Sequence, residues 1–310
     1  MQKTKIIIAG IGGVGGYFGA LLARHFENNN QVEINFIARG KHLEEIKKNG
    51  LLALKGTDKI IARPTHATDN PAEIGLVDYI IICTKTYDLE TIIQQLKPCI
   101  SNDTCIIPLL NGVNNKEVIK RSVPNGLVVD GCAYIIARLT APGVIENIGN
   151  IQQLHFGIDN DENEKLRLLE RLLKEAGIEA FYSTCISKVI WEKFIFLSAT
   201  ATTTSFLDKN IDEIVSNTDY CNTLIKMIEE VKQLAQAKQI AISTNITQEI
   251  LTRMKSIPAN TTTSMHTDFQ HHKPHTELQS LTGFVINEAS KYSIPTPTYE
   301  MMYEKLKKRT

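Results

Sequence analysis

Lys193 carries a charge inside an unusually apolar stretch of the chain. The residues around it predict a helix that is buried nearly all round: Val189, Ile190, Phe194, Phe196 and Leu197. A lysine in such a helix either extends its ammonium to the surface or faces a cavity. In a cavity, desolvation would lower the pKa of the ammonium, which could then donate a proton to a developing alkoxide. These residues alone leave both alternatives open.

Two further polar residues follow apolar runs that predict buried strands. Lys85 comes directly after 79–84, and Asn111-Gly112 comes directly after 106–110. Open α/β sheets bind ligands at the carboxyl ends of their strands, so we expect Lys85 to contact a cofactor or substrate. Asn-Gly commonly marks only a turn. Alternatively, the Asn111 amide could orient a nicotinamide ribose or a substrate carbonyl.

A run of hydroxyl side chains and a later acid complete the candidates in the second half of the chain. Thr261-Thr262-Thr263-Ser264 leads into a predicted helix. Helix capping accounts for one of these hydroxyls, whereas the others could donate hydrogen bonds to a substrate carboxylate. Glu277 is either a surface acid or a residue that holds a substrate hydroxyl.

The first forty residues predict the element that binds a dinucleotide. An apolar strand, 5–9, runs into a glycine turn, and an Ala-rich helix follows. In this arrangement Gly10 allows the tight turn, Gly12 lets backbone N–H groups approach the pyrophosphate, and Gly15 lets the helix pack on the strand. The phosphates then lie at the positive end of the helix. The residues that we expect at the cofactor are Gly10, Ile11, Gly12, Gly13, Val14 and Gly15.

The residues after the second predicted strand favour NADP over NAD. An NAD enzyme usually places an acid there for the ribose 2′-hydroxyl. Here the strand 32–38 ends in Arg39-Gly40-Lys41. A guanidinium binds a 2′-phosphate with a planar pair of N–H donors, and Lys41 adds charge. The alternative is a solvated basic loop.

Composition excludes several other classes of function. The 310 residues have a formal net charge of zero and 43% hydrophobic content. Nothing therefore points to a nucleic acid or an acidic membrane as partner. The six cysteines lack C-x-x-C spacing, and no signal peptide or apolar span is evident, so we expect reduced thiols in a cytoplasmic protein. We predict no metal site at His271, His272 and His275, because no carboxylate or cysteine lies at a matching spacing.

The order of elements predicts two domains. Strands expected at 5–9, 32–38, 78–83, 104–109 and 127–133 alternate with helices at 14–27, 41–48, 88–97 and 114–121. Two hairpin strands, 144–147 and 151–157, a helix, 162–175, and a short strand, 178–182, finish this half. Helices are expected after it at 186–204, 216–239, 247–256, 275–291 and 298–308. We predict an α/β Rossmann-type domain, 1–184, an all-α domain, 185–310, and an active site in the cleft between them.

Taken in order, these pieces resemble the ketopantoate reductase (2-dehydropantoate 2-reductase) family over essentially the whole chain. The matching segments are 10–15, Ala38-Arg39-Gly40, Thr84-Lys85, Asn111-Gly112, Pro142-Gly143, Trp191-Glu192-Lys193, Thr263-Ser264-Met265 with Asp268, Thr276-Glu277-Leu278 and Thr282-Gly283. The resemblance implies NADPH-dependent reduction of 2-dehydropantoate to (R)-pantoate, on the route to pantothenate and coenzyme A. It also implies a helical C-terminal domain like that of 6-phosphogluconate dehydrogenase. A homodimer is implied too, although no sequence feature demands one.

The resemblance assigns roles at matching positions. Lys193 is similar to the family's proton donor to the C2 carbonyl oxygen, and Asn111 to the asparagine shared by cofactor and substrate. Ser264 resembles the hydroxyl on the substrate carboxylate, and Glu277 the acid near the substrate hydroxyl and the cofactor. On the cofactor side, Lys85 and Ala137 match contact positions, and Arg39 matches the arginine that selects the 2′-phosphate.

Two departures from the family pattern keep alternatives open on the substrate side. The family often has asparagines four and eight residues after the lysine, where this chain has Leu197 and Ala201. Ser198, Thr200 or Thr202 could replace them only if the helix is turned. His275 is an extra residue, which would rotate Glu277 by about 100° in a continuous helix, although a bulge or a later helix start could absorb it. The alternatives are therefore a reductase of another small branched 2-oxo acid, or a non-catalytic NADPH-binding sensor.

Overall fold

The computed structural model describes residues 3–309 and divides into two compact units. The first, an α/β unit, consists of the residues up to Leu110 and of the segment Asn114–Ile186. The second, a helical unit, takes the segment Asn111–Val113 together with the residues from Ser187 onward. The predicted combination of a Rossmann-type α/β part and an all-α part is confirmed.

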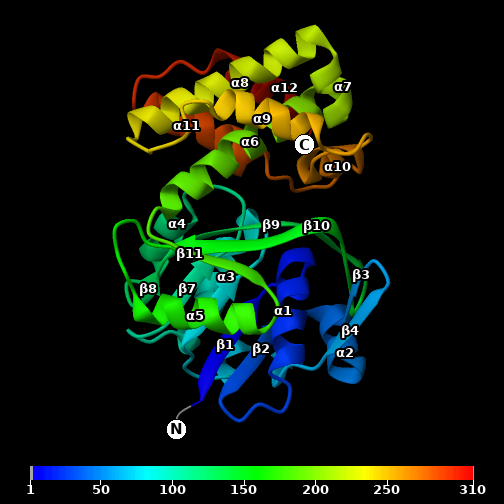
Figure 1. Ribbon diagram of the computed structural model, residues 1–310, viewed down its shortest axis with the longest axis vertical. Helices are drawn as coiled ribbons and strands as arrows, with labels where there is room; N and C mark the ends of the chain where they lie inside the picture. Colours follow the sequence, from blue (N-terminus) through cyan, green and yellow to red (C-terminus); the bar gives the residue numbers. More distant parts are fainter. Residues whose placement is uncertain (1–2, 310) are drawn as a thin grey trace. The chain divides into compact units, whose positions relative to one another are not determined.

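The first sheet of the α/β unit has six parallel strands (Figure 1). In spatial order they are β5 (His66–Thr68), β2 (Val32–Ile37), β1 (Thr4–Ala9), β6 (Tyr79–Ile82), β7 (Cys105–Pro108) and β8 (Leu127–Val128). The order reverses between β1 and β6, as in dinucleotide-binding sheets. A ligand of this unit is therefore expected at the carboxyl ends of β1 and β6.

Alternate residues of each strand pack against helices on opposite faces of this sheet. Ile6 and Ile8 belong to one core with side chains of α1 (Gly13–His25), α2 (Gly40–Asn49) and α5 (Glu164–Glu175). Ile7 and Ala9 belong to another core with α3 (Leu89–Leu96) and α4 (Asn115–Ser122). A parallel sheet buried on both faces needs continuous apolar strands, which explains the run Ile6-Ile7-Ile8-Ala9.

A second sheet packs on the far side of α1 and α5. Its strands are β11 (Glu179–Ser183), β10 (Val144–Gly157), β3 (Leu51–Lys55), β4 (Asp58–Ala62) and β9 (Asp130–Ala141), which pairs with β10. The predicted hairpin between 144–147 and 151–157 is wrong, because both segments belong to β10. The hairpin joins β9 to β10 instead, and a register shift between Asn147 and Gln152 explains the interrupted pattern. The strands β3, β4 and β5 are short and were not predicted.

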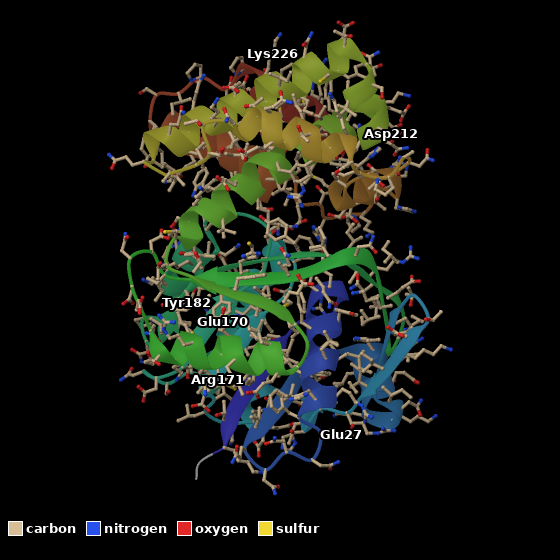
Figure 2. The ribbon with its side chains drawn as sticks, viewed as in Figure 1. Glu27, Glu170, Arg171, Tyr182, Asp212 and Lys226 are labelled. Atoms are coloured by element: carbon tan, nitrogen blue, oxygen red, sulfur yellow. The ribbon has the colours of Figure 1, made fainter. Side chains whose placement is uncertain are left out.

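The end of the α/β unit is held by contacts between α5 and β11. The backbone N–H of Tyr182 donates to the Glu170 carboxylate (3.1 Å), and both residues are labelled in Figure 2. Asn163 caps α5 by accepting from the N–H groups of Lys165 and Leu166. These bonds fix the last predicted helix and strand of this unit in place.

Within the described residues, the helical unit consists of seven α-helices, one π-helical turn and a final 3-10 turn, η5 (Lys307–Arg309). Before η5 lie α6 (Ile186–Leu207, of which Ile186 belongs to the first unit), α7 (Ile211–Ser216), α8 (Thr218–Ala237), α9 (Ile246–Lys255), α10 (Ser264–Gln270), the π-helical turn η4 (Gln279–Gly283), α11 (Phe284–Ser290) and α12 (Pro297–Leu306). The prediction missed α7, whose six residues are too short to show a helical period. No helix in the part of the chain that the structure describes is long and apolar enough to cross a membrane.

Candidate active site

The glycine turn between β1 and α1 has the close approaches that the sequence predicted. Gly10 has a φ of +95°, and a Cβ there would lie 2.8 Å from the side chain of Thr84. A Cβ on Gly15 would lie 2.2 Å from the Gly10 carbonyl oxygen. Both positions therefore admit only glycine without a shift of the backbone.

The next two glycines differ from each other in a way that locates the space for a ligand. A Cβ on Gly13 would lie 2.0 Å from the carbonyl oxygen of Ala137, so α1 packs directly on β9. A Cβ on Gly12 would meet nothing within 4 Å. Gly12 is the N-cap of α1 and, as a glycine, has no side chain that could cap the helix. This helix end offers backbone N–H groups to an open space, and a pyrophosphate fits it.

Thr84 adds an unsatisfied polar group beside the same turn. Its hydroxyl oxygen is buried, and it has no hydrogen-bond partner among residues 3–309. A buried hydroxyl without a partner costs free energy, so such a group signals a missing ligand or water. Lys85 follows it directly and begins the 3-10 turn η2 (Thr86–Asp88) after β6. The predicted contact of Lys85 with the cofactor stays a prediction.

Arg39 follows β2 and is the N-cap of α2. Its side chain is 85% exposed, and its guanidinium nitrogen Nη2 lies 3.6 Å from a carboxylate oxygen of Asp88. No motif in the sequence singled out Asp88. An aspartate just before a helix is typical of capping, and only the fold brings it to Arg39.

In the helical unit, Asn111 joins Lys193 to Glu277. The Lys193 ammonium donates to Asn111 Oδ1 (3.3 Å), and Asn111 Nδ2 donates to Glu277 Oε2 (3.1 Å). The amide is thus oriented by a cation on one side and an anion on the other. Glu277 is only 2% exposed. Burying a carboxylate lowers the stability of the fold, and charged groups of opposite sign in one partly buried hydrogen-bonded series are typical of a functional site.

Each member of this group is positioned by a different local feature. Lys193 lies on α6, and its ammonium reaches Asn111. Gly112 has a φ of +102°, so the backbone bends sharply after Asn111. The Asn111 amide at this bend bonds to Lys193 and Glu277. Glu277 directly precedes the helical residue Leu278, whose N–H donates to Thr276 Oγ1 (3.3 Å).

The extra residue His275 does not displace Glu277. The predicted helix 275–291 is wrong at its start: α10 ends at Gln270, and the next helical residue is Leu278. His275 therefore lies in a loop, where an inserted residue rotates nothing. The π-helical turn η4 begins two residues after Glu277, at Gln279. Such turns carry an extra residue within a helix and are frequent at functional sites.

The hydroxyls of α6 do not take the places of the missing asparagines. Ser198 pairs with the Tyr299 hydroxyl (3.0 Å), Thr200 contacts the Met254 sulfur (3.8 Å), and Thr202 pairs with Thr282 (2.7 Å). All three are buried inside the helical unit. Leu197 and Ala201 therefore keep the positions one and two turns after Lys193.

Most of the predicted hydroxyl run is engaged within the fold. Thr261 donates to the Pro258 carbonyl oxygen, and Thr262 pairs with His266 Nδ1. Thr263 caps α10 and also pairs with Thr204. Ser264, in contrast, is exposed at the start of α10. Its contact with a substrate carboxylate stays a prediction.

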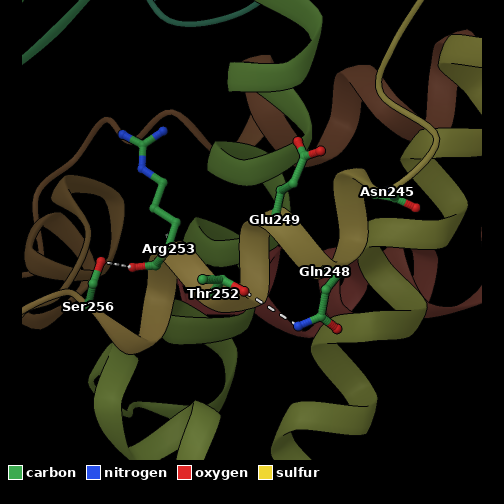
Figure 3. A pocket seen from close by; sticks show the side chains of 6 residues that line it. All are labelled: Asn245, Gln248, Glu249, Thr252, Arg253 and Ser256. Atoms are coloured by element: carbon green, nitrogen blue, oxygen red, sulfur yellow. Dashed lines mark hydrogen bonds between the residues drawn. The ribbon is translucent and has the colours of Figure 1, made fainter.

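A separate surface hollow lies along one helix, α9 (Figure 3). Its lining residues are Asn245, Gln248, Glu249, Thr252, Arg253 and Ser256. None of these belongs to the predicted site, and they offer no nucleophile paired with a base. We assign no chemistry to it. The residues that the structure describes hold no group of three or more His, Cys, Asp or Glu side chains suited to a metal ion.

Two family models match the chain and together cover most of it. Residues 6–160 match "Ketopantoate reductase PanE/ApbA", and residues 186–310 match "Ketopantoate reductase PanE/ApbA C terminal". Among curated relatives, the uncharacterized oxidoreductase YkpB of Bacillus subtilis is 29% identical, with 97% of each chain covered. The 2-dehydropantoate 2-reductase of Streptococcus pyogenes serotype M1 is also 29% identical, over 96% of this chain and 95% of that one.

Solved structures with this fold include reductases and a dehydrogenase. A crystal structure of 2-dehydropantoate 2-reductase from Porphyromonas gingivalis W83 is 36% identical, with a TM-score of 0.87, and 98% and 99% of the two chains are covered. A ternary structure of D-mandelate dehydrogenase with NADH and anilino(oxo)acetate has a TM-score of 0.85 at 24% identity, over 99% and 98% of the chains. The second likeness shows the fold alone.

Proposed function

The chain belongs to the ketopantoate reductase family, and from this premise we propose that it reduces 2-dehydropantoate to (R)-pantoate with NADPH. Members of this family are oxidoreductases that depend on a nicotinamide dinucleotide. The proposal places the reaction in pantothenate and coenzyme A biosynthesis, in a cytoplasmic homodimer, with no nucleic acid and no membrane as partner.

The observation that carries the proposal is the hydrogen-bonded series Lys193, Asn111 and Glu277. Reduction of a ketone develops negative charge on its oxygen, which needs a cation and a proton. The Lys193 ammonium supplies both. It donates its proton to the carbonyl oxygen, and the resulting neutral amine recovers a proton from solvent.

Asn111 and Glu277 act on the orientation of this lysine. The Asn111 oxygen holds the ammonium, while the buried Glu277 carboxylate fixes which way the amide faces. In this proposal Ser264 binds the substrate carboxylate, and Glu277 lies near the substrate hydroxyl and the cofactor.

The α/β unit supplies the cofactor-binding residues of the proposal. When bound, NADPH supplies the hydride that adds to the carbonyl carbon. Backbone N–H groups at Gly12 to Val14 would hold its pyrophosphate at the start of α1. Lys85 and Ala137 are the further contact positions. The exposed Arg39 guanidinium would take the 2′-phosphate, which distinguishes NADPH from NADH.

A second candidate substrate is favoured by one specific observation. Leu197 and Ala201 follow Lys193 on its side of α6, and the neighbouring hydroxyls are paired elsewhere. An apolar surface there suits a small branched 2-oxo acid that lacks the hydroxyl of 2-dehydropantoate. Its hydroxyl-free counterpart, 3,3-dimethyl-2-oxobutanoate, is the matched compound for comparison.

The test is NADPH oxidation with each of these two acids, for the wild type and for Lys193→Ala. We expect the wild type to turn over 2-dehydropantoate, and the variant to lose about 10²- to 10⁴-fold in kcat, the usual range for a lost general acid. The affinity for NADPH, measured by calorimetry, should not change. Turnover of the dimethyl acid alone would favour the second candidate. No turnover despite tight NADPH binding would contradict both and favour a non-catalytic sensor.

A further inference from the structure

Asp88 occupies a position typical of helix capping but does not cap. It is the N-cap residue of α3, and the structure records no hydrogen bond from the described N–H groups of that helix to its carboxylate. Instead, Asp88 Oδ2 lies 3.6 Å from Arg39 Nη2. The carboxylate is thus directed at the arginine that follows β2.

This contact changes what the sequence implied about the cofactor. The sequence lacks an acid at the end of β2, but the fold brings one there from the turn after β6. The pair is exposed, with 85% of the arginine side chain and 38% of the aspartate side chain accessible. Exposed ion pairs are weak, so a phosphate can displace Asp88 from Arg39.

Displacement would leave a carboxylate beside a phosphate. A 2′-phosphate carries close to two negative charges, and Asp88 is held near Arg39 by the start of α3. The phosphate therefore gains an arginine but meets a like charge, whereas the 2′-hydroxyl of NADH meets no repulsion.

We propose that Asp88 is a specificity-determining residue that competes with the 2′-phosphate for Arg39 and so narrows the preference for NADPH over NADH. This inference rests on the proposed use of Arg39 for the 2′-phosphate. It concerns the relative affinity of two cofactors and not the identity of the substrate.

The experiment measures the dissociation constants of NADPH and NADH by titration calorimetry at low ionic strength, where screening is weak. Asp88→Asn removes the charge and keeps the shape. We expect it to tighten NADPH binding about fivefold and to change NADH binding by less than about twofold, since one exposed charge pair is worth about this much. The effect should shrink as salt is raised.

Two variants exclude other causes. Glu90→Gln removes a neighbouring exposed carboxylate of α3 and should leave both affinities within about twofold of wild type. In an Arg39→Gln background, Asp88→Asn should change the NADPH to NADH ratio far less than in the wild type. An equal effect in that background, or the same effect from Glu90→Gln, would contradict competition for Arg39.

The failure of this inference and that of the proposed function have different signatures. An unchanged ratio in Asp88→Asn, with NADPH still bound by the wild type, would overturn only the role of Asp88. Absence of NADPH binding by the wild type would overturn the proposed function and this inference together.

Discussion

At the scale of single residues, Asn111 determines how a cation and an anion coexist in the helical unit. It bonds to Lys193 and to Glu277 through one amide, whose two ends have opposite hydrogen-bonding character. The two bonds fix which way the amide faces and place its oxygen against the Lys193 ammonium.

The four glycines of the first turn give a prediction at the same scale. Gly12→Ala puts a methyl group into open space, so the free energy of unfolding should stay within about 1 kcal/mol of wild type. The methyl group would occupy the space of the pyrophosphate, and NADPH affinity should fall at least about tenfold.

Gly13→Ala is the matched control. Its Cβ would overlap the Ala137 carbonyl oxygen, so the free energy of unfolding should fall by about 1–3 kcal/mol. Urea denaturation and calorimetry measure both quantities. A Gly12→Ala protein that binds NADPH normally would contradict this placement of the cofactor.

Asp208 gives a prediction about pH. It follows α6 with a φ of +53°, and its carboxylate lies 2.7 Å from Nε2 of the buried His266. Hydrogen bonds from His266 and then from Gln270 hold the pKa of Asp208 below its usual value. A carboxyl with a lowered pKa stabilises the fold above its unfolded pKa of about 3.9, and this contribution is lost as pH falls through the folded pKa.

The stability advantage of the wild type over Asp208→Asn should therefore be present at neutral pH and shrink below about pH 4. Urea denaturation at several pH values measures this difference. Glu304→Gln, an exposed carboxylate of α12, serves as the control for a general loss of charge. A difference that grows as the pH falls would show that the wild type does not depend on the ionised form of Asp208.

At the scale of elements, α6 is the helix that carries Lys193 and buries one stretch of its residues completely. It carries Lys193 near one end, and from Ser198 to Ser205 every residue is buried. Three of its hydroxyls, those of Ser198, Thr202 and Thr204, hydrogen-bond to other segments of the unit and so fix the rotation of α6 about its own axis. That rotation decides which way the face with Lys193, Leu197 and Ala201 is turned.

The Thr202–Thr282 pair tests this role. It joins α6 to the π-helical turn that follows Glu277, with 2.7 Å between two fully buried hydroxyls. Thr202→Val deprives a buried hydroxyl of its partner and should cost about 1–3 kcal/mol of unfolding free energy. Thr202→Val/Thr282→Val removes both hydroxyls and should cost less than the sum of the single changes. Thr200→Val, which loses only a contact to sulfur, should have the smaller effect. Additive costs in urea denaturation would contradict coupling between these elements.

At the scale of the whole molecule, the two units hold different parts of the proposed chemistry. The α/β unit contains the glycine turn, Thr84, Lys85, Arg39 and Ala137, while Lys193, Glu277 and Asn111 belong to the helical unit. Asn111 therefore belongs to the helical unit, although the strand β7 that precedes it in the chain belongs to the α/β unit. The reaction that we propose requires both sets of residues, so neither set alone accounts for the function.

The sequence by itself determined the parallel sheet, the glycine turn and the helical second half. Each of these follows from local patterns: continuous apolar strands, glycine spacing and a helical period. Local patterns also singled out Lys193 and Asn111, because each is polar within or after an apolar run, whereas the role of Glu277 came from the family resemblance. The family models confirm the resemblance of the chain to ketopantoate reductases, while the roles of these residues stay predictions.

Only the tertiary structure decided which of these residues meet. Asn111 and Glu277 are 166 positions apart, and the contact between Asp88 and Arg39 depends on the parallel order of β2, β1 and β6. It also showed that β10 is one strand, since pairing with β9 continues across the register shift. Hydrogen bonds between distant segments leave no periodic trace in a sequence. A pattern can therefore identify a polar residue as unusual, but its partner emerges only when the chain is folded.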